Sequence, residues 1–429
     1  MTTARILALA ALTLLGSTAW GAKPEDPNWL QWRGPEREGK ATSTGLLPNW
    51  DSAQPKLLGM VEGLGGGYAS VSIVDNMLYT TGNFDKAQGV VAVDLNTQQI
   101  AWKTPVTESV PEHGYGGSRS TPTIDGDFLY VVMSDGTVAS LDRKSGRGVW
   151  RRSFEKEYGA KRPAWGFAES PLIDGNLVIC TPGAEQALML ALNKKTGKEV
   201  WATRGAQLGE KGKAEAGYSS IVIGTGGGVK QYVQMTGKGL VGVRAKDGKF
   251  LYNYNAVAND VAVIPTPIVD GDYVFASSGY QTGAGLVKLS RARSGNVRAE
   301  EVYFLEPKTF QNHHGGMVKL GDYIYAGTKH NEGFPICIEM KTGEVQWGGN
   351  FRGEGKGSAA VLYADGNFIF RYQSGELALV EATPKEYVLK GKFMPEYQER
   401  ESWAHPVVAD GKLYLREQDK LMIYDLTQK

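Results

Sequence analysis

The chain has 429 residues, with 47 Lys and Arg against 46 Asp and Glu, so its net charge is close to zero. This balance gives no general attraction to nucleic acid or to an anionic membrane surface, and we expect no nucleic-acid partner. The 56 glycines, 20 tyrosines and 10 tryptophans are typical of an all-β protein, in which tight turns connect aromatic and β-branched strands.

The first 22 residues have the pattern of a signal peptide. Arg5 provides a short basic start, and the apolar run from Ile6 to Leu15 is too short to span a bilayer. Small residues follow, as at a cleavage site, and an uncleaved anchor is the alternative. No other stretch is long and apolar enough to cross a membrane. We therefore expect an exported protein of the periplasm or cell envelope, or a secreted one.

Residues 23–54 contain prolines and glycines and are expected to form an N-terminal extension that wraps the outside or one face of the domain. Trp29 and Trp32 are three positions apart and are predicted to anchor this segment. Arg33, in the sequence QWRGP, is interpreted as a structural residue of the same anchor. The domain itself is predicted to occupy residues 55–429 without a linker that would divide it.

The rest of the chain repeats one plan. Each unit has a short strand, an Asp-Gly type turn, and a second strand rich in Tyr, Val and Ile. A third strand with the pattern apolar-x-apolar-Asp follows, then a Thr-Gly or Ser-Gly turn and a fourth strand that ends in Trp. Asp-Gly turns favour tight hairpins because both residues tolerate positive φ. Four strands joined by such turns form one antiparallel blade of a β-propeller.

The spacing of the first turn predicts the number of blades. Successive turns are 45 to 50 residues apart, with one double interval of 96 residues that contains a degenerate turn near Gly224. The turn positions are Asn76, Gly126, Gly175, Gly271, Gly321, Gly366 and Gly411. The fourth strands close with Trp102, Trp150, Trp201 and Trp347, and with Tyr252 and Tyr303 as substitutes. These eight inner hairpins predict an eight-bladed propeller.

The ring is expected to be closed by an N-terminal strand. The last unit stops at Lys429 before a fourth strand, and residues 55–64 read as a lone strand. Pairing these two parts would complete blade eight and remove exposed sheet edges, which are prone to aggregation. Cys180 and Cys337 fall in the third and sixth blades, where we expect both to be buried apolar side chains rather than a disulfide scaffold.

The repeat pattern apolar-x-Ala-Leu-Asp-x-x-Thr-Gly-x-x-x-Trp occurs here as LALNKKTGKEVW and ASLDRKSGRGVW. It resembles the signature of the PQQ-like (pyrroloquinoline quinone-type) β-propeller repeat family. The opening WLQWRGPEREG is similar to the start of secreted PQQ-like repeat proteins of planctomycetes. The chain also resembles BamB-like scaffold propellers of outer-membrane protein assembly, which hold no cofactor. Fold alone does not assign a function among these groups.

Enzymes of this family imply a PQQ site with Ca²⁺ in the central funnel, a vicinal Cys-Cys disulfide, a stacking Trp and a catalytic Asp. This chain has no adjacent Cys pair, and only Asn259-Asp260 imitates part of a Ca²⁺ site, in a segment that reads as a turn. The leading hypothesis is a non-enzymatic binding or scaffold propeller, a monomer with no cofactor, no metal and no assigned catalytic residue. The alternatives are a PQQ-dependent alcohol or sugar oxidoreductase with Ca²⁺, and a carbohydrate-binding or carbohydrate-processing protein.

The residues that precede each inner strand predict a ligand-binding face at the mouth of the central channel. The aligned positions are Tyr68, Arg119, Ala168, Tyr218, Ile264, His314, Ser358 and Trp403, and nearby loops add His113, Tyr115, Trp165, His313 and His405. Because His313 and His314 are adjacent, alternation along a strand would send them to opposite faces, so at most one is expected at a common site.

Among these residues, the predicted ligand contacts are Tyr68, Arg119, Tyr218, His314, Trp403, His113, Trp165 and His405. A cup lined by stacking rings and hydrogen-bond donors would suit a small molecule such as a carbohydrate, a planar ligand, or a peptide segment of a cell-envelope protein. The other interpretation is that these side chains fill the channel and satisfy one another.

Overall fold

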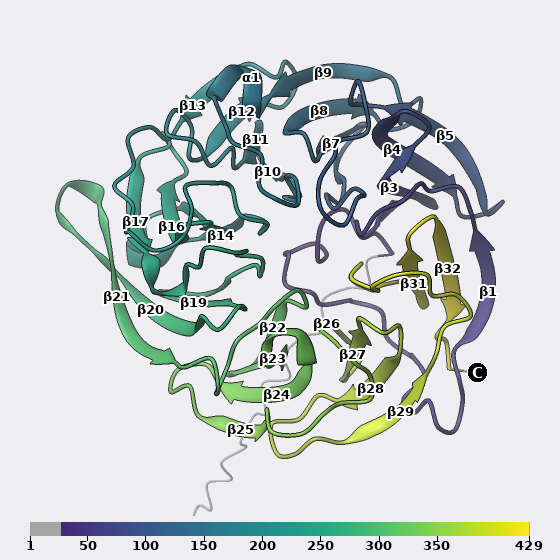
Figure 1. Cartoon of the computed structure of the whole chain (residues 1–429). Coiled ribbons are helices and arrows are strands. Elements are labelled where there is room, and N and C mark those ends of the chain that lie inside the picture. Colours follow the sequence, from purple (N-terminus) through teal and green to yellow (C-terminus); the bar gives the residue numbers. More distant parts are fainter. Residues whose placement is uncertain (1–26, 429) are drawn as a thin grey trace, which may run out of the picture.

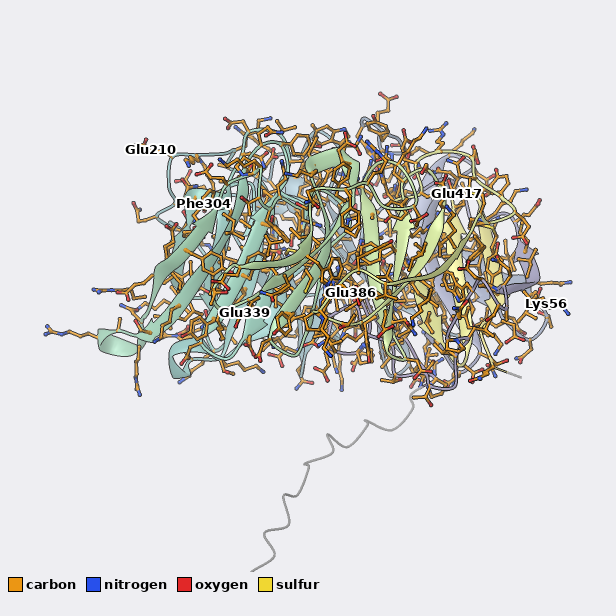
Figure 2. The ribbon with its side chains drawn as sticks, turned by 90° about the horizontal axis from the view of Figure 1, so that it is seen from below. Lys56, Glu210, Phe304, Glu339, Glu386 and Glu417 are labelled. Atoms are coloured by element: carbon orange, nitrogen blue, oxygen red, sulfur yellow. The ribbon has the colours of Figure 1, made fainter. Side chains whose placement is uncertain are left out.

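The computed structural model describes residues 27–428, so the predicted signal peptide, residues 1–22, lies outside the described residues. Eight four-stranded antiparallel sheets form a ring around a common centre (Figure 1). Seen from the side, the blades form a disc, with Glu210 and Glu417 towards one face (Figure 2). The prediction of an all-β, eight-bladed propeller is confirmed.

Seven blades use four consecutive strands, and we number them along the chain. Blades 1 to 3 contain β2 (Ser72–Val74), β3 (Met77–Phe84), β4 (Ala87–Asp94) and β5 (Gln99–Pro105); β6 (Thr123–Asp125), β7 (Phe128–Val132), β8 (Thr137–Asp142) and β9 (Gly148–Ser153); and β10 (Leu172–Asp174), β11 (Leu177–Cys180), β12 (Leu190–Asn193) and β13 (Glu199–Ala202). Blades 4 and 5 contain β14 (Val222–Gly224), β15 (Gln231–Thr236), β16 (Gly239–Arg244) and β17 (Phe250–Tyr254); and β18 (Ile268–Asp270), β19 (Tyr273–Ser278), β20 (Gly283–Arg291) and β21 (Val297–Leu305). Blades 6 and 7 contain β22 (Met317–Leu320), β23 (Tyr323–Thr328), β24 (Phe334–Glu339) and β25 (Val345–Gly348); and β26 (Ala359–Ala364), β27 (Asn367–Tyr372), β28 (Leu377–Glu381) and β29 (Leu389–Phe393).

Blade 8 is built from both ends of the described chain. It combines β30 (Val407–Ala409), β31 (Lys412–Glu417) and β32 (Lys420–Asp425) with β1 (Lys56–Val61), which is the outer strand. β1 pairs antiparallel with β32, from Lys56 opposite Asp425 to Val61 opposite Leu421. The purple β1 beside the yellow β32 shows this closure in Figure 1. The predicted closing strand is therefore confirmed, and the pairing covers the edge that β32 would otherwise expose.

Helical segments are few and short. They are α1 (Phe154–Tyr158), η1 (Gly226–Gly228), η2 (Asn255–Val257), η3 (Arg293–Gly295) and η4 (His330–Glu332). The turn η1 connects β14 to β15, so the glycine-rich stretch there is the degenerate hairpin of blade 4, as predicted. Within residues 27–428, none of the helices has the length and apolar character needed to cross a membrane.

The residues shared by the repeats join neighbouring blades. Trp150, at the end of blade 2, lies against Gly197 of blade 3, where a Cβ atom would be 2.7 Å from indole Cδ2. Gly197 also has φ of 69°, which glycine adopts without strain. The Trp150 Nε1 donates a hydrogen bond to the Lys194 carbonyl oxygen at 2.9 Å. The Trp of one blade thus packs against the Thr-Gly turn of the next blade. This contact between blades explains why both residues recur in the repeats, and it needs no ligand.

Both cysteines are free and buried, Cys180 in β11 of blade 3 and Cys337 in β24 of blade 6. Cys180 packs in the apolar cluster between blades 2 and 3, and Cys337 in the cluster between blades 6 and 7. The expectation of two buried apolar side chains is confirmed.

The N-terminal segment crosses the centre of the ring on one face, where Figure 1 shows it in purple. Trp29 exchanges two backbone hydrogen bonds of 2.8 Å with Ile73 of blade 1, and Gly39 accepts one of 2.9 Å from Tyr363 of blade 7. Between these points, Arg37 donates to the Ser170 carbonyl oxygen of blade 3 at 2.6 Å. The segment therefore lies across one face, as expected, and it also obstructs the channel there.

Candidate functional site

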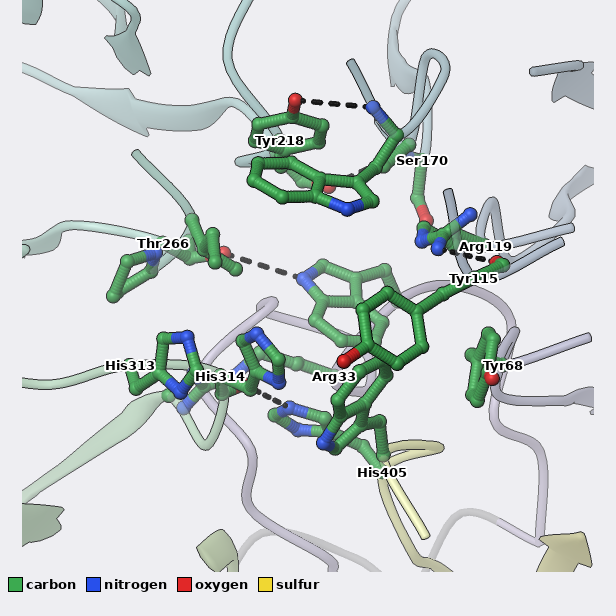
Figure 3. A pocket seen from close by; sticks show the side chains of 18 of the residues that line it. Arg33, Tyr68, Tyr115, Arg119, Ser170, Tyr218, Thr266, His313, His314 and His405 are labelled. Atoms are coloured by element: carbon green, nitrogen blue, oxygen red, sulfur yellow. Dashed lines mark hydrogen bonds between the residues drawn. The ribbon is translucent and has the colours of Figure 1, made fainter. Parts of the chain in front are cut away.

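A cup of about 210 Å³ lies at the centre of the propeller, against the crossing N-terminal segment (Figure 3). Its lining brings together seven of the eight positions aligned from the sequence: Tyr68, Arg119, Ala168, Tyr218, Ile264, His314 and Trp403. The loop residues Tyr115, Trp165, His313 and His405 line it too. The eighth aligned residue, Ser358, lies behind this surface and hydrogen bonds to His313 at 2.8 Å. His113 stands beside Arg119, 3.4 Å from its Nη1.

Aromatic rings form most of the wall. The ring of Trp403 lies 4.9 Å from that of Tyr68 and 5.0 Å from that of Tyr115, measured between centroids. On the other side, Trp165 lies 5.7 Å from Tyr218, whose hydroxyl accepts a hydrogen bond from the Trp165 backbone N–H at 3.3 Å. Because these contacts are mostly tilted or edge-on, ring faces remain available for stacking with a ligand.

Arg119 is held in place by backbone carbonyls and by an aromatic ring. Its Nη2 donates to the Tyr115 carbonyl oxygen at 2.7 Å, and its Nη1 donates to the Gly117 carbonyl oxygen at 3.0 Å. The guanidinium carbon lies 5.3 Å from the centroid of Tyr68, a cation–π distance. Burial lowers the Arg119 pKa to about 10, so the group stays charged at neutral pH.

The expectation that only one of His313 and His314 faces the site is wrong. Both line the cup, and their rings stack at 3.7 Å. The two residues lie in a bend before β22, which begins at Met317, so strand alternation does not apply to them. The ring of His314 meets that of Trp403 edge-on at 4.4 Å, and His405 Nε2 donates to the His314 carbonyl oxygen at 3.1 Å.

Two residues of the N-terminal segment form the floor of the cup, and the sequence did not reveal them as site residues. Trp32 lies 4.5 Å from the ring of His405 and donates from Nε1 to Thr266 Oγ1 at 3.3 Å. Arg33 donates from Nη2 to the Met317 carbonyl oxygen. Both lie outside the repeats, so aligning the repeats could not place them. The one local signal was a tryptophan next to an arginine in a turn sequence.

The lining does not fit a PQQ site with Ca²⁺. Calcium prefers several oxygen ligands, among them carboxylates, yet no Asp or Glu among residues 27–428 lines the cup. Over the same residues, no group of three or more His, Cys, Asp and Glu could hold a metal ion. Asn259 accepts hydrogen bonds from the backbone N–H groups of Val261 and Ala262, at 2.9 and 2.8 Å, so the Asn-Asp pair forms the turn predicted for it.

A shallow groove continues from the cup onto the surface. The two share Tyr115, Asn331 and Gln373. The groove has a volume of about 800 Å³ and carries charges of both signs, from Glu332, Arg352, Lys356, Glu399, Arg400 and Glu401. A ligand larger than one ring could therefore leave the cup along this groove.

Two buried histidines of the cup predict a dependence of stability on pH. Burial lowers the pKa of His313 and of His405 to about 3, whereas an exposed histidine has a pKa near 6.5. Between these values the unfolded chain binds protons that the folded chain does not, so the free energy of unfolding falls as pH falls. From pH 7 to pH 4.5 we expect a loss of about 2–3 kcal/mol per histidine, measured by urea denaturation.

The variant His405→Gln isolates this effect, since glutamine can keep the hydrogen bond to the His314 carbonyl oxygen. A control is needed because burial raises the pKa of Glu169 to about 8, which acts in the opposite direction and favours the folded state as pH falls. Below about pH 6 we expect the wild type to lose stability relative to His405→Gln as the pH falls. Parallel stability curves for the two proteins would contradict the prediction.

One protein-family model matches this chain. The family model described as outer membrane protein assembly factor BamB matches residues 8–162 and 86–349. Among curated proteins, quinohemoprotein alcohol dehydrogenase ADH-IIG of Pseudomonas putida is 28% identical over 140 residues, which cover 31% of this chain and 19% of that protein. BamB of Moranella endobia is 22% identical over 192 residues, 44% of this chain and 43% of that protein. The matches span less than half of either relative.

Solved structures share the fold at low sequence identity. BamB from Moraxella catarrhalis has a TM-score of 0.59 and 12% identity, with 87% of this chain and 98% of that chain covered. Quinohemoprotein alcohol dehydrogenase from Comamonas testosteroni has a TM-score of 0.64 and 11% identity, with 94% and 81% covered. An outer membrane protein assembly factor and an alcohol dehydrogenase are therefore both similar in fold, and fold alone does not choose between their functions.

Proposed function

Because the chain belongs to the PQQ-like propeller family represented by outer membrane protein assembly factor BamB, we propose that it is a non-enzymatic binding or scaffold propeller of the cell envelope. Its ligand or partner binds at the mouth of the cup. The predicted signal peptide, residues 1–22, would deliver the protein to this compartment.

The observation that carries the proposal is the composition of the cup. Its wall offers aromatic faces and hydrogen-bond donors, which bind ligands, but no carboxylate from residues 27–428 to hold Ca²⁺ or to act as a general base. Burial also keeps His313 and His405 neutral at physiological pH, so neither binds a proton there. A PQQ-dependent oxidoreductase, the second candidate, is supported by fold likeness but not by this lining.

Site-specific crosslinking tests where the partner binds. Tyr115 stands at the rim of the cup with 51% of its surface exposed, and Val200 is a similarly exposed residue on β13, the outer strand of blade 3. A photoreactive amino acid at position 115 is expected to capture a cell-envelope component in cells, whereas the same group at position 200 should capture none. The measurement is the mass shift of the protein after irradiation.

Two results would contradict the proposal. One is equal capture at positions 115 and 200, which would mean that the cup does not select the partner. The other is stoichiometric binding of added PQQ and Ca²⁺ by the purified protein, with turnover in a dye-linked alcohol assay, which would establish the oxidoreductase.

A further inference from the structure

The guanidinium of Arg33 is buried at the floor of the cup with hydrogen-bonding capacity left over. Its side chain is 4% exposed, and Nε and Nη1 have no hydrogen-bond partner in the described structure. A Cβ atom on Gly316 would lie 2.1 Å from Nη1 and 3.1 Å from Cε1 of His405, and both of these residues line the cup. The unpaired Nη1 is therefore covered by Gly316 and lies just beneath the cup wall, where Figure 3 shows Arg33 near His314 and His405.

The charge of Arg33 has no counter-ion nearby. Within the described range 27–428, no carboxylate oxygen lies within 4 Å of Arg33 or of Arg119, the other arginine of the cup. Glu38, the acidic residue that acts on Arg33 at longer range, is exposed and pairs instead with Lys40 at 2.6 Å. A buried charge without a partner is costly.

The backbone at Arg33 forms a tight turn. Arg33 has φ of 61°, a left-handed conformation that is unfavourable for a residue with a Cβ atom and that glycine adopts freely. Arg37 of the same segment has a similar φ of 59°, so this conformation belongs to the tight turns of the segment. Here the Gly39 N–H donates to the Arg33 carbonyl oxygen at 2.8 Å and fixes the turn.

We propose that the cup binds a ring that carries a carboxylate, with Arg33 as the anchor for the carboxylate and the aromatic wall as the platform for the ring. This inference rests on the proposed function, because it names the ligand of the same cup. A guanidinium matches a planar carboxylate in geometry and charge. Arg119 also lines the cup, but its Nη1 and Nη2 already donate to backbone carbonyl oxygens, so Arg33 is the arginine of the cup with unused N–H groups.

The size of the cup sets the size of the group it takes. Its volume of about 210 Å³ is below the roughly 300–1,000 Å³ of sites for drug-sized ligands, so one ring with its substituents fits. Two sources share this chemistry: an acidic sugar, whose pyranose face stacks on tryptophan and tyrosine, and an aromatic acid. In either case the rest of a larger ligand could lie in the groove beyond Tyr115.

The test compares acids with neutral analogues of the same ring on the purified full-length chain. Glucuronate is compared with glucose, and benzoate is compared with benzyl alcohol. The pair that binds shows whether the ligand is an acidic sugar or an aromatic acid. Binding is followed by calorimetry and by the fluorescence of Trp32, Trp165 and Trp403, which line the cup. We expect one acid to bind about 10- to 100-fold more tightly than its neutral analogue, since hydrogen bonds to charged groups are the stronger class. Added salt should weaken the binding of the acid but not the binding of its neutral analogue.

Arg33→Gln should reduce this preference to near parity. Arg37→Gln is the matched control: Arg37 lies in the same segment, is equally buried, and donates to the Ser170 and Pro171 carbonyl oxygens without lining the cup. It should keep the preference for the acid. If Arg33→Gln does not fold, Arg33→Lys replaces it: lysine keeps the charge but loses the planar fork, so a reduced preference for the acid in this variant still separates Arg33 from Arg119 as the anchor.

Equal binding of acid and neutral analogue, or a preference that persists in Arg33→Gln, would overturn the carboxylate anchor while leaving the cup as a binding site. Absence of binding by both acids would overturn the inference as well. None of these results affects the crosslinking experiment at position 115. Failure of that crosslinking would count against the proposed function instead.

Discussion

Replacing Glu417 by Ala is expected to lower the free energy of unfolding by about 3–5 kcal/mol, because it leaves a buried positive charge without its partner. Glu417 of blade 8 and Arg371 of blade 7 form an ion pair at 2.9 Å in which both side chains are 1% exposed. The same carboxylate accepts hydrogen bonds from Ser402 Oγ at 2.7 Å and from the Arg400 backbone N–H at 3.1 Å. Desolvation of Arg371 already lowers its pKa, which indicates the cost of this burial.

The matched control is Glu332→Ala. Glu332 also pairs with an arginine, Arg352, but both side chains are about half exposed, and exposed pairs contribute roughly 0–1 kcal/mol. Urea denaturation followed by circular dichroism measures both variants. A loss of less than about 1 kcal/mol in Glu417→Ala would mean that the pair between blades 7 and 8 does not stabilise the ring as argued here.

Replacing Trp50 by Ala is expected to cost about 3–5 kcal/mol of folding free energy, as for other large core side chains. Trp50 lies in the N-terminal segment yet is only 1% exposed. Its ring meets that of Phe393 edge-on at 5.2 Å, and its backbone N–H donates to the Lys390 carbonyl oxygen at 2.6 Å. Both partners belong to β29, the outer strand of blade 7. The segment that reaches the cup floor is thus also held by the core.

Met394→Ala provides the control, since Met394 follows Phe393 directly but is exposed, and its truncation should change stability by no more than about 0.5 kcal/mol. Thermal unfolding of the two variants measures the difference. If Trp50→Ala unfolds at the wild-type temperature, the N-terminal segment is a loose attachment rather than part of the folded ring.

The eight blades could be predicted from the sequence because a repeat encodes each blade locally. Turn residues such as Gly126 and Gly175 recur at nearly constant spacing, and the alternating apolar residues between them need only their own blade and its neighbour to become buried. The closing strand could be predicted for the same reason, since the last repeat has three strands of its own and the strand left over near Lys56 can supply the fourth.

The cup could be predicted in part. Repeat alignment identified Tyr68, Tyr218 and Trp403 as residues at one mouth, because equivalent positions of a symmetric ring converge there. The strand alternation that would have placed only one of His313 and His314 at the site was wrong, because the chain bends there before β22. Loop geometry of this kind depends on packing, not on local pattern.

The amino-acid sequence by itself therefore determined the number of blades, their closure and the ring of aromatic residues, since these follow from a pattern repeated along the chain. Only the tertiary structure decided that the N-terminal segment crosses the centre of the ring and that the floor of the cup carries Arg33, whose Nε and Nη1 have no hydrogen-bond partner. Arg33 lies 284 residues from Met317, whose carbonyl oxygen it contacts, and no repeat includes it. A contact between a unique segment and the centre of a ring arises only when all eight blades are in place.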